Sequence, residues 1–168
     1  RGKDYSLVLT AKHVVMTATK LTVSFYGDEV EHDAYVLMMA GDLDLAVVKV
    51  EHRHDFEAVL SDNLEHGVFT EVWRIGAGLT GEIHASNGHI AETGNYFMQI
   101  SAGVNKGDSG GPVFAFEDGK WRVVGITIAV GLKNVIFPKG VPLNAITSSP
   151  NIGYAHDTLS FMEFLTGM

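Results

Sequence analysis

The sequence predicts an all-β protein built from short antiparallel strands. Strand-like apolar segments recur along the 168 residues with turn signals between them. Glycine is abundant, with 19 residues against 4 prolines, which suits many tight turns. Hydrophobic residues make up 46% of the chain, enough for a substantial core. The length leaves room for one compact unit or for two small barrels that share an interface.

The strand-like segments fall into two groups separated by a polar, irregular stretch, His52–Gly67. We expect this stretch to connect an N-terminal barrel, residues 1–65, to a C-terminal barrel, residues 66–168. The pair Asp118-Gly119 predicts a hairpin, and Leu159–Leu165 has the length and apolar spacing of a short C-terminal helix. The expected strands are Tyr5–Leu9, Leu21–Tyr26, Ala34–Met39 and Leu45–Val50 in the first group, and Glu71–Ile75, Gly81–Ala85, His89–Glu92, Tyr96–Ile100, Pro112–Phe116, Trp121–Val130 and Val135–Pro142 in the second.

Composition excludes several classes of function. The net charge of −8 and the absence of Lys/Arg-rich runs argue against binding to a nucleic-acid backbone. The absence of cysteine excludes disulfides, thiol catalysis and thiolate metal sites. No signal peptide is visible, and the longest mostly apolar run, Val123 to Leu132, is too short to span a bilayer. The first residue is Arg, so we expect a processed, excised or incomplete chain, and its composition fits the cytoplasm of an infected host cell or a bacterial compartment.

The most informative segment is Gly107-Asp108-Ser109-Gly110-Gly111-Pro112. A serine hydroxyl is a poor nucleophile at neutral pH, so it has to be presented sharply and beside a base. The flanking glycines allow a tight turn that a Cβ would obstruct, and they leave the N–H of Gly107 free to face a substrate carbonyl oxygen. The segment therefore predicts that Ser109 is a catalytic nucleophile.

A histidine and an aspartate stand where the rest of a catalytic triad is needed. The stretch Leu7–Val15 is a strand that ends in a small-residue turn carrying His13. The stretch Gly41–Val50 is an acidic turn that opens into a buried strand, and it offers Asp42 and Asp44. We prefer Asp44 because it directly precedes the apolar run, which would hold its carboxylate rigidly behind the imidazole.

The chain order His13, Asp44, Ser109 is the order of chymotrypsin-like enzymes, whereas subtilisins and α/β-hydrolases use other orders. On these motifs the chain resembles the chymotrypsin-like serine peptidases. The resemblance implies two six-stranded antiparallel β-barrels, with the triad assembled across their interface. Only four residues precede Tyr5, so we expect a first barrel that is either trimmed or lacking upstream residues.

The resemblance also implies the role of each site residue. His13 would be the general base toward Ser109, Asp44 would orient the imidazole, and the N–H groups of Gly107 and Ser109 would form the oxyanion hole. No cofactor or metal is required for this reaction, and the partner is a polypeptide substrate. Trypsin-type zymogens bury a new N-terminus against the acid that Asp108 matches. Because Arg1 does not resemble such a terminus, we expect Asp108 to find another partner.

The specificity pocket of the resembled family points to apolar substrates. Trypsin-like enzymes carry an acid six residues before the serine, and Gly103 stands there, so a preference for Arg or Lys is not expected. Relatives that select Gln or Glu often carry a His where Thr127 stands. We expect an apolar, narrow pocket with walls from Gly103, Val104, Ile128, Ala129 and Val130. A minor alternative is that Lys106 or Lys133 attracts an acidic substrate side chain.

Two subgroups of the family resemble the chain. Ile75-Gly76, Gly88-His89-Ile90 and Gln99-Ile100 are similar to the high-temperature-requirement (HtrA) protease domain, although Asp108 stands where that subgroup usually has Asn. The small size and the absence of cysteine are similar to viral processing proteases of the astrovirus type, which would process a polyprotein. The alternatives are a non-catalytic binding or assembly module and, less favoured, a lipase or esterase. We interpret the cluster Glu51–Asp55 as an exposed turn, and we expect no metal site.

Overall fold

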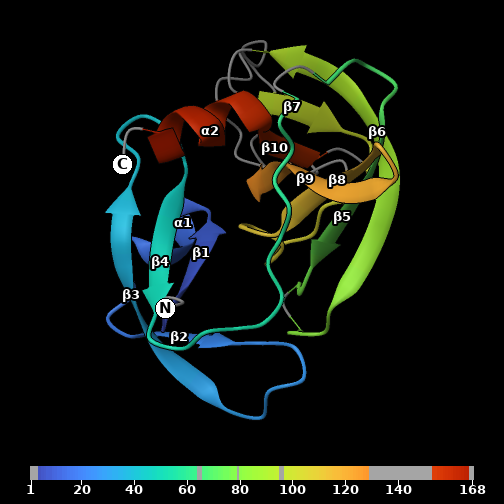
Figure 1. Cartoon of the computed structure of the whole chain (residues 1–168). Coiled ribbons are helices and arrows are strands. Elements are labelled where there is room, and N and C mark those ends of the chain that lie inside the picture. Colours follow the sequence, from blue (N-terminus) through green and yellow to red (C-terminus); the bar gives the residue numbers. More distant parts are fainter. Residues whose placement is uncertain (1–3, 64–65, 79, 95–96, 129–152, 167–168) are drawn as a thin grey trace, which may run out of the picture.

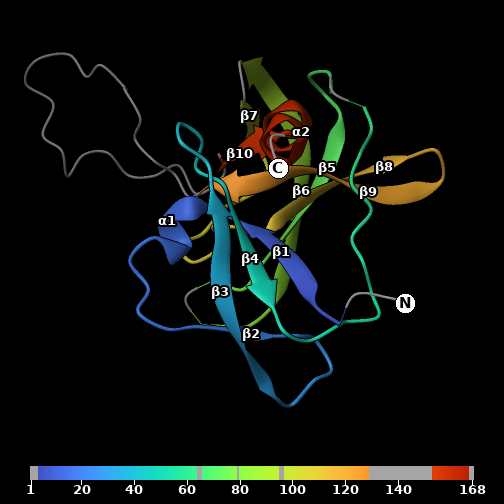
Figure 2. The same cartoon turned by 60° about the vertical axis from the view of Figure 1, so that its left-hand side comes forward.

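The fold joins an open β-sheet to a closed β-barrel (Figures 1 and 2). The computed structural model describes residues 4–63, 66–78, 80–94, 97–128 and 153–166. The sheet is formed by the N-terminal part of the chain and the barrel by the C-terminal part. The prediction of an all-β protein is therefore confirmed.

The sheet has four antiparallel strands in the order β1-β4-β3-β2. Strand β4 is central, and four of its five residues are buried. Strand β3 alternates exposed and half-buried residues, as expected for a strand with one face on a core. Between β1 and β2 lies a one-turn helix, α1, which was not predicted. The elements are β1 (Ser6–Thr10), α1 (Lys12–Val15), β2 (Leu21–Ser24), β3 (Glu31–Met39) and β4 (Ala46–Val50).

The barrel has six antiparallel strands and closes in the order β10-β7-β6-β5-β8-β9. Its interior holds a cluster of buried apolar residues, ten of them among the described residues, including Val72, Ile100 and Val113. The predicted hairpin is present between β8 and β9, where Asp118 and Gly119 both have positive φ, as a type I′ turn requires. The elements are β5 (Glu71–Gly76), β6 (His84–Gly94), β7 (Phe97–Ile100), β8 (Pro112–Glu117), β9 (Lys120–Ile128) and β10 (Gly153–Asp157).

Two predicted features of the barrel were wrong. The expected strands Gly81–Ala85 and His89–Glu92 are replaced by one strand, β6, that continues through the residues between them, including Gly88. A Cβ on Gly88 would collide with the backbone of Ala102, so this glycine allows two backbone segments of the barrel to approach closely and does not form a turn. Strand β10 was missed because Gly153–Asp157 has little apolar alternation. The expected strand Val135–Pro142 lies outside the described residues.

A shared core joins the sheet to the barrel. Leu45 of the sheet side packs in one cluster with Val123 and Ile126 of β9, and Met162 and Phe164 of the C-terminal helix α2 (Thr158–Thr166) pack against it. The predicted C-terminal helix is thereby confirmed, and it lies beside both halves (Figure 1). Among the described residues, no helix is long and apolar enough to cross a membrane.

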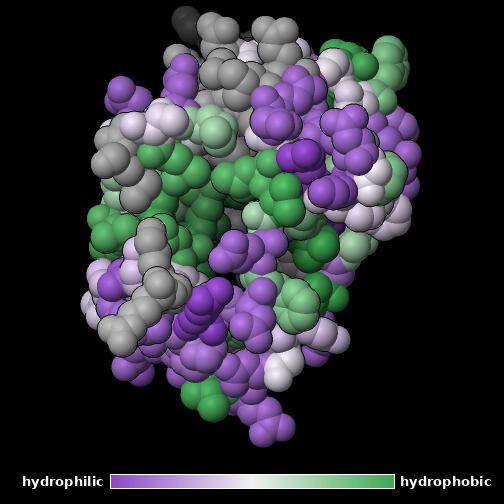
Figure 3. All heavy atoms as spheres, viewed as in Figure 1, coloured by the Kyte–Doolittle hydropathy of each residue, from purple (hydrophilic) through white to green (hydrophobic). Residues whose placement is uncertain are grey.

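A cavity of about 620 Å³ lies between the two halves, bounded by β1, the 53–60 segment and the strands β8 and β9. On the face shown in Figure 3, hydrophobic side chains border the upper and left sides of a hollow, and hydrophilic side chains lie below it. The interface between the two halves is therefore packed around Leu45 and open at the cavity.

Candidate active site

The structure brings His13 and Asp44 together at one end of the sheet. Strand β1 leads into α1, which carries His13, and Asp44 stands in the turn before β4. His13 Nδ1 lies 2.6 Å from Asp44 Oδ2, and the His13 backbone N–H donates to Asp44 Oδ1 over 2.8 Å. Because the carboxylate can only accept, Nδ1 carries a proton and Nε2 is the basic nitrogen. The side chains of His13 and Asp44 are 41% and 25% exposed, so the pair is accessible.

The carboxyl group of Asp44 is held in its ionised form. Burial by itself would raise its pKa, but the side-chain and backbone hydrogen bonds from His13 outweigh burial, so the pKa of Asp44 is lowered. An ionised carboxylate behind the imidazole fixes the tautomer and favours the imidazolium. Asp42, the rival acid, is exposed and makes no hydrogen bond within the described residues.

Two side chains that sequence reasoning missed hold the Asp44 turn in place. Lys12 Nζ donates to the carbonyl oxygens of Ala40 and Gly41, at 2.7 and 2.9 Å. The Asp44 N–H donates to Nε2 of His156 over 3.0 Å. His156 is buried on β10, 112 positions further along the chain, and no local signal pointed to it. The barrel therefore positions the aspartate of the sheet.

The loop that carries Ser109 is tied to β9 on one side and touches the sheet on the other. The Gly110 N–H donates to the Thr127 carbonyl over 2.7 Å, and the Thr127 N–H donates to the Gly111 carbonyl over 2.8 Å. Gly110 has φ +86, and a Cβ on it would collide with Thr10 Oγ1 and lie 3.1 Å from the N of Ala11. Thr10 and Ala11 directly precede α1, so the residue after Ser109 packs against the chain that leads to His13.

The backbone amides assigned to the oxyanion hole are available. Gly107 has φ +98, a backbone conformation that favours glycine. Within the described ranges, the N–H groups of Gly107 and Ser109 donate to no other residue. Over the same ranges, no hydrogen bond joins Ser109 Oγ to the His13 imidazole.

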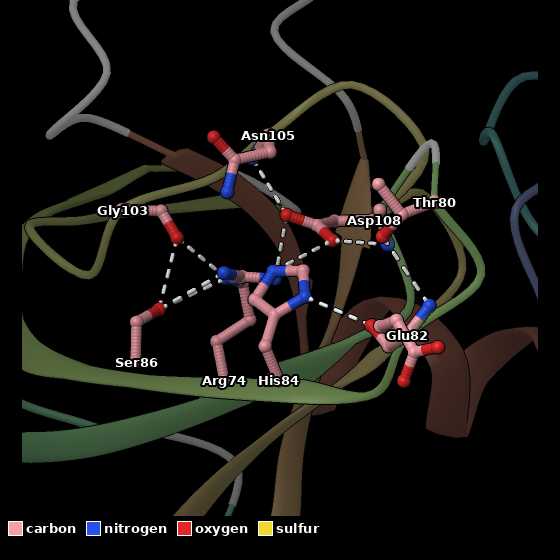
Figure 4. Close-up of polar contacts among 9 residues, drawn as sticks. Arg74, Thr80, Glu82, His84, Ser86, Gly103, Asn105 and Asp108 are labelled. Carbon is pink, nitrogen blue, oxygen red and sulfur yellow. Dashed lines mark hydrogen bonds and ion pairs between the residues drawn. The ribbon is translucent and has the colours of Figure 1, made fainter.

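The residue before the serine, Asp108, anchors the loop in the barrel wall (Figure 4). Its Oδ2 lies 2.7 Å from Nη1 of Arg74 and accepts the Asn105 N–H over 2.6 Å. Its Oδ1 accepts the Gly78 N–H over 3.0 Å and lies 3.2 Å from Nε2 of His84. Arg74 is thus the charged partner of Asp108, and this agrees with our expectation that Asp108 pairs with a group other than the N-terminus.

Arg74 links two parts of the same loop. Its side chain and that of Asp108 are both 0% exposed. Its Nε donates to the Gly103 carbonyl over 2.7 Å, and Ser86 Oγ donates to the same carbonyl over 2.9 Å. Burial lowers the pKa of the Arg74 guanidinium, while the charge of Asp108 acts in the opposite direction. Sequence reasoning missed Arg74, because a charged residue in an alternating strand is ordinarily solvent-facing.

The pocket residues expected from sequence lie around this loop. Gly103 carries no acid, and its carbonyl is used by Arg74. Val104 and Thr127 are buried in the barrel, and Ile128 is half-buried at the end of β9. The remaining two expected wall residues, Ala129 and Val130, lie outside the described residues.

The known proteins to which this chain is similar are peptidases. A family model described as a trypsin-like peptidase domain matches residues 1–126. A probable periplasmic serine endoprotease, DegP-like, of Bartonella henselae is 35% identical over 132 residues, which cover 73% of this chain and 25% of the relative. The magnetosome formation protease MamE of Magnetospirillum gryphiswaldense is 29% identical over 148 residues, which cover 80% of this chain and 19% of the relative. The chain therefore spans about a quarter or less of the length of these relatives.

Solved structures share the fold. The serine endoprotease from Yersinia pestis superposes with a TM-score of 0.77 at 22% identity, covering 98% of this chain and 54% of that one. The HtrA-type protease AlgW, solved with a decapeptide, gives a TM-score of 0.74 at 23% identity, covering 98% of this chain and 49% of that one. At these identities the likeness concerns the fold alone.

Proposed function

The chain belongs to the trypsin-like peptidase family, and from this premise we propose that it is a serine endopeptidase with the triad Ser109, His13 and Asp44. The observation that carries the proposal is the 2.6 Å contact between His13 Nδ1 and Asp44 Oδ2, with the pKa of Asp44 lowered although burial opposes this. That contact leaves Nε2 of His13 as a base. A histidine on a solvent-exposed turn would ordinarily contact water, whereas the backbone N–H and Nδ1 of His13 contact the two carboxylate oxygens of Asp44.

The proposed reaction is acyl transfer to Ser109 followed by hydrolysis. Ser109 Oγ attacks the carbonyl carbon of the scissile bond while Nε2 of His13 takes the hydroxyl proton. Asp44 stabilises the imidazolium, and the N–H groups of Gly107 and Ser109 donate to the oxyanion. The imidazolium then gives its proton to the leaving amine. Water, activated by the same nitrogen, releases the acid from the acyl-enzyme and restores Ser109.

The proposal divides the work between two halves, residues 1–65 with the base and the acid, and residues 66–168 with the nucleophile and the pocket. Two contacts between the halves support it: the bond from Asp44 to His156, and the packing of Gly110 against Thr10. A small relative shift of the two halves would change the position of His13 relative to Ser109, and a misplacement of about 1 Å can lower the rate about a hundredfold.

The proposed substrates are polypeptides with apolar side chains at the cleavage site. Gly103 offers no carboxylate at the pocket base, and the guanidinium of Arg74 behind it is fully buried and paired, so it is no docking point for an acidic side chain. Val104 follows Gly103 directly and is buried, and Ile128 at the end of β9 is half-buried and apolar. Gly103, Val104 and Ile128 would give a buried substrate cation no charged partner, so the cation would carry a desolvation penalty.

The relatives reported above are bacterial, which favours the HtrA-type subgroup over a viral processing protease. The names of several describe periplasmic serine endoproteases. We extend the proposal to a bacterial compartment of the same kind, with polypeptides as substrates.

Labelling with a fluorophosphonate tests the proposal without knowledge of the substrate. The reagent should modify Ser109 in the folded chain, and the labelling rate should fall by orders of magnitude in His13→Ala. Asp42→Asn is the matched control, because Asp42 neighbours Asp44 but makes no hydrogen bond within the described residues. A folded chain that resists labelling would refute the proposal and favour a non-catalytic binding module.

A further inference from the structure

Three side chains of the types that ligate metal ions meet at the end of the sheet opposite the proposed triad. Asp28 stands in the turn between β2 and β3, His32 on β3, and His52 just after β4. Their ligand atoms all lie within 4.8 Å of one another. Nε2 of His32 lies 2.7 Å from Asp28 Oδ2, and Nε2 of His52 lies 3.9 Å from the same oxygen. All three side chains are partly buried, with exposed fractions between 18% and 36%.

The turn presets the carboxylate of Asp28. Gly27 has φ +84, and the Asp28 N–H donates to the Phe25 carbonyl over 3.0 Å, which closes the turn. The Val30 N–H then donates to Asp28 Oδ1 over 3.0 Å. One carboxylate oxygen is therefore occupied by the backbone, and the other, Oδ2, faces both imidazoles. Outer contacts of this kind orient ligands in metal sites.

Two imidazoles and one carboxylate are donors suited to a borderline divalent ion. Zinc takes nitrogen ligands at about 2.0–2.1 Å and carboxylate oxygens at about 2.0–2.2 Å in a tetrahedral arrangement, so that neighbouring ligand atoms are about 3.3 Å apart. The separations of 2.7 and 3.9 Å from Asp28 Oδ2 fall on either side of that value. The rings of His32 and His52 stack with centroids 3.9 Å apart. Each ring would have to turn about χ2, a torsion with a broad energy well.

We propose that Asp28, His32 and His52 form a zinc-binding site, with a fourth position open to water or to a further ligand. The site joins the β2–β3 turn to the start of the segment that connects the sheet to the barrel. Asp44 precedes β4 and His52 follows it, so the proposed site and the triad lie at opposite ends of that strand. The ion would consequently have a structural role, stabilising the sheet without entering the reaction.

A neighbouring histidine provides a matched control. His54 stacks on Phe25 with ring centroids 4.6 Å apart, and its Nδ1 accepts the Phe56 N–H over 3.3 Å. It belongs to the same surface but not to the group of converging ligand atoms. His54→Ala should therefore leave metal binding intact, while a general affinity of a histidine-rich surface would be weakened by it.

The experiment is a titration of the folded chain with Zn²⁺ by calorimetry, with Co²⁺ as a spectroscopic probe of tetrahedral coordination. We expect one equivalent bound, a rise in melting temperature with Zn²⁺, and loss of affinity by more than about tenfold in Asp28→Asn, His32→Gln and His52→Gln. Fluorophosphonate labelling of these variants should be unchanged, so failure of the zinc site and failure of the triad are distinguishable.

Two results would overturn the proposal. One is no saturable binding to the wild-type chain up to about 100 μM Zn²⁺, a concentration at which even a weak three-ligand site should fill. The other is an equal loss of affinity in His54→Ala and in the ligand variants. If a ligand variant fails to fold, histidine NMR signals of the wild-type chain decide: those of His32 and His52 should shift with Zn²⁺, and that of His89 should not.

Discussion

Replacing Asp108 by Asn tests whether the loop of the nucleophile is held by a buried charge pair. Both partners, Asp108 and Arg74, have fully buried side chains 2.7 Å apart. The amide keeps an acceptor for the Gly78 N–H, which lies 3.0 Å from Oδ1, but it removes the only counter-charge that lies within ion-pair distance of Arg74 in the described part of the chain. The amide also turns its NH₂ group toward the Asn105 N–H and Nη1 of Arg74, from which Oδ2 accepts, so the variant keeps the shape of the side chain but removes the charge together with one acceptor.

The expected cost follows from the burial of the pair. Breaking a buried ion pair by neutralising one partner costs about 3–5 kcal/mol. For chains of 150–250 residues, each kcal/mol lowers the melting temperature by about 2–4 °C, so we expect a fall of about 6–20 °C. Arg74→Met should lie at the lower end of this range, because Asp108 would keep the N–H groups of Gly78 and Asn105 and the nearby His84 imidazole.

The assay is urea unfolding of the two single variants and the double variant. If the charges are coupled, the double variant should be more stable than the sum of the single changes predicts, by about 2 kcal/mol. Asp62→Asn is the control: Asp62 is 86% exposed and lies 3.7 Å from Arg122, and such surface pairs contribute about 0–1 kcal/mol.

Additivity of the single changes to within about 0.5 kcal/mol would refute the reasoning. Since Ser109 follows Asp108 directly, the Asp108→Asn variant should also lose fluorophosphonate reactivity at temperatures where it is still folded. Full reactivity in a destabilised variant would mean that the charge pair supports the barrel but not the position of the nucleophile.

The remaining predictions concern the triad and the pocket. Ser109→Ala and His13→Ala should each abolish peptide hydrolysis with the fold retained, and the double variant should lose little more, which kinetic measurements of all three would check. Asp44→Asn should lower kcat by about four orders of magnitude and Asp42→Asn only slightly, because an Asn at the acid position favours the wrong tautomer; the reverse ranking would overturn the choice of acid. The rate should rise with pH between about pH 5 and 8, since a histidine that acts as general base must be neutral to accept a proton. Asp44 should add no second ionisation there, because its hydrogen bonds from His13 lower its pKa against the effect of burial; a flat profile of a folded chain would exclude His13 as the base. A peptide library should show preference for Ala, Val or Leu over Arg and Lys at the cleavage site, and a clear preference for Arg would contradict a pocket based on Gly103.

Local sequence was sufficient where a feature depends on neighbouring residues. The Asp118-Gly119 hairpin and the C-terminal helix were predicted because turn chemistry and apolar spacing act over a few residues. The single strand β6 was misread for the converse reason, since the role of Gly88 depends on Ala102 across the barrel. Strand β10 likewise forms because it fills the gap between β7 and β9, not because of its own composition.

The candidate site divides in the same way. The residue types and their order, His13, Asp44 and Ser109, could be read from the chain because each stands in a short motif with its own turn. Only the tertiary structure selected the supports: His156 reaches Asp44 across 112 positions, and Arg74 reaches Asp108 across 34 positions. Hydrogen bonds and ion pairs between distant segments depend on how the strands close, and no local pattern encodes that closure. The grouping of Asp28 with His32 and His52 arose the same way, because the pairing of β3 with β4 brings together side chains that the sequence keeps apart.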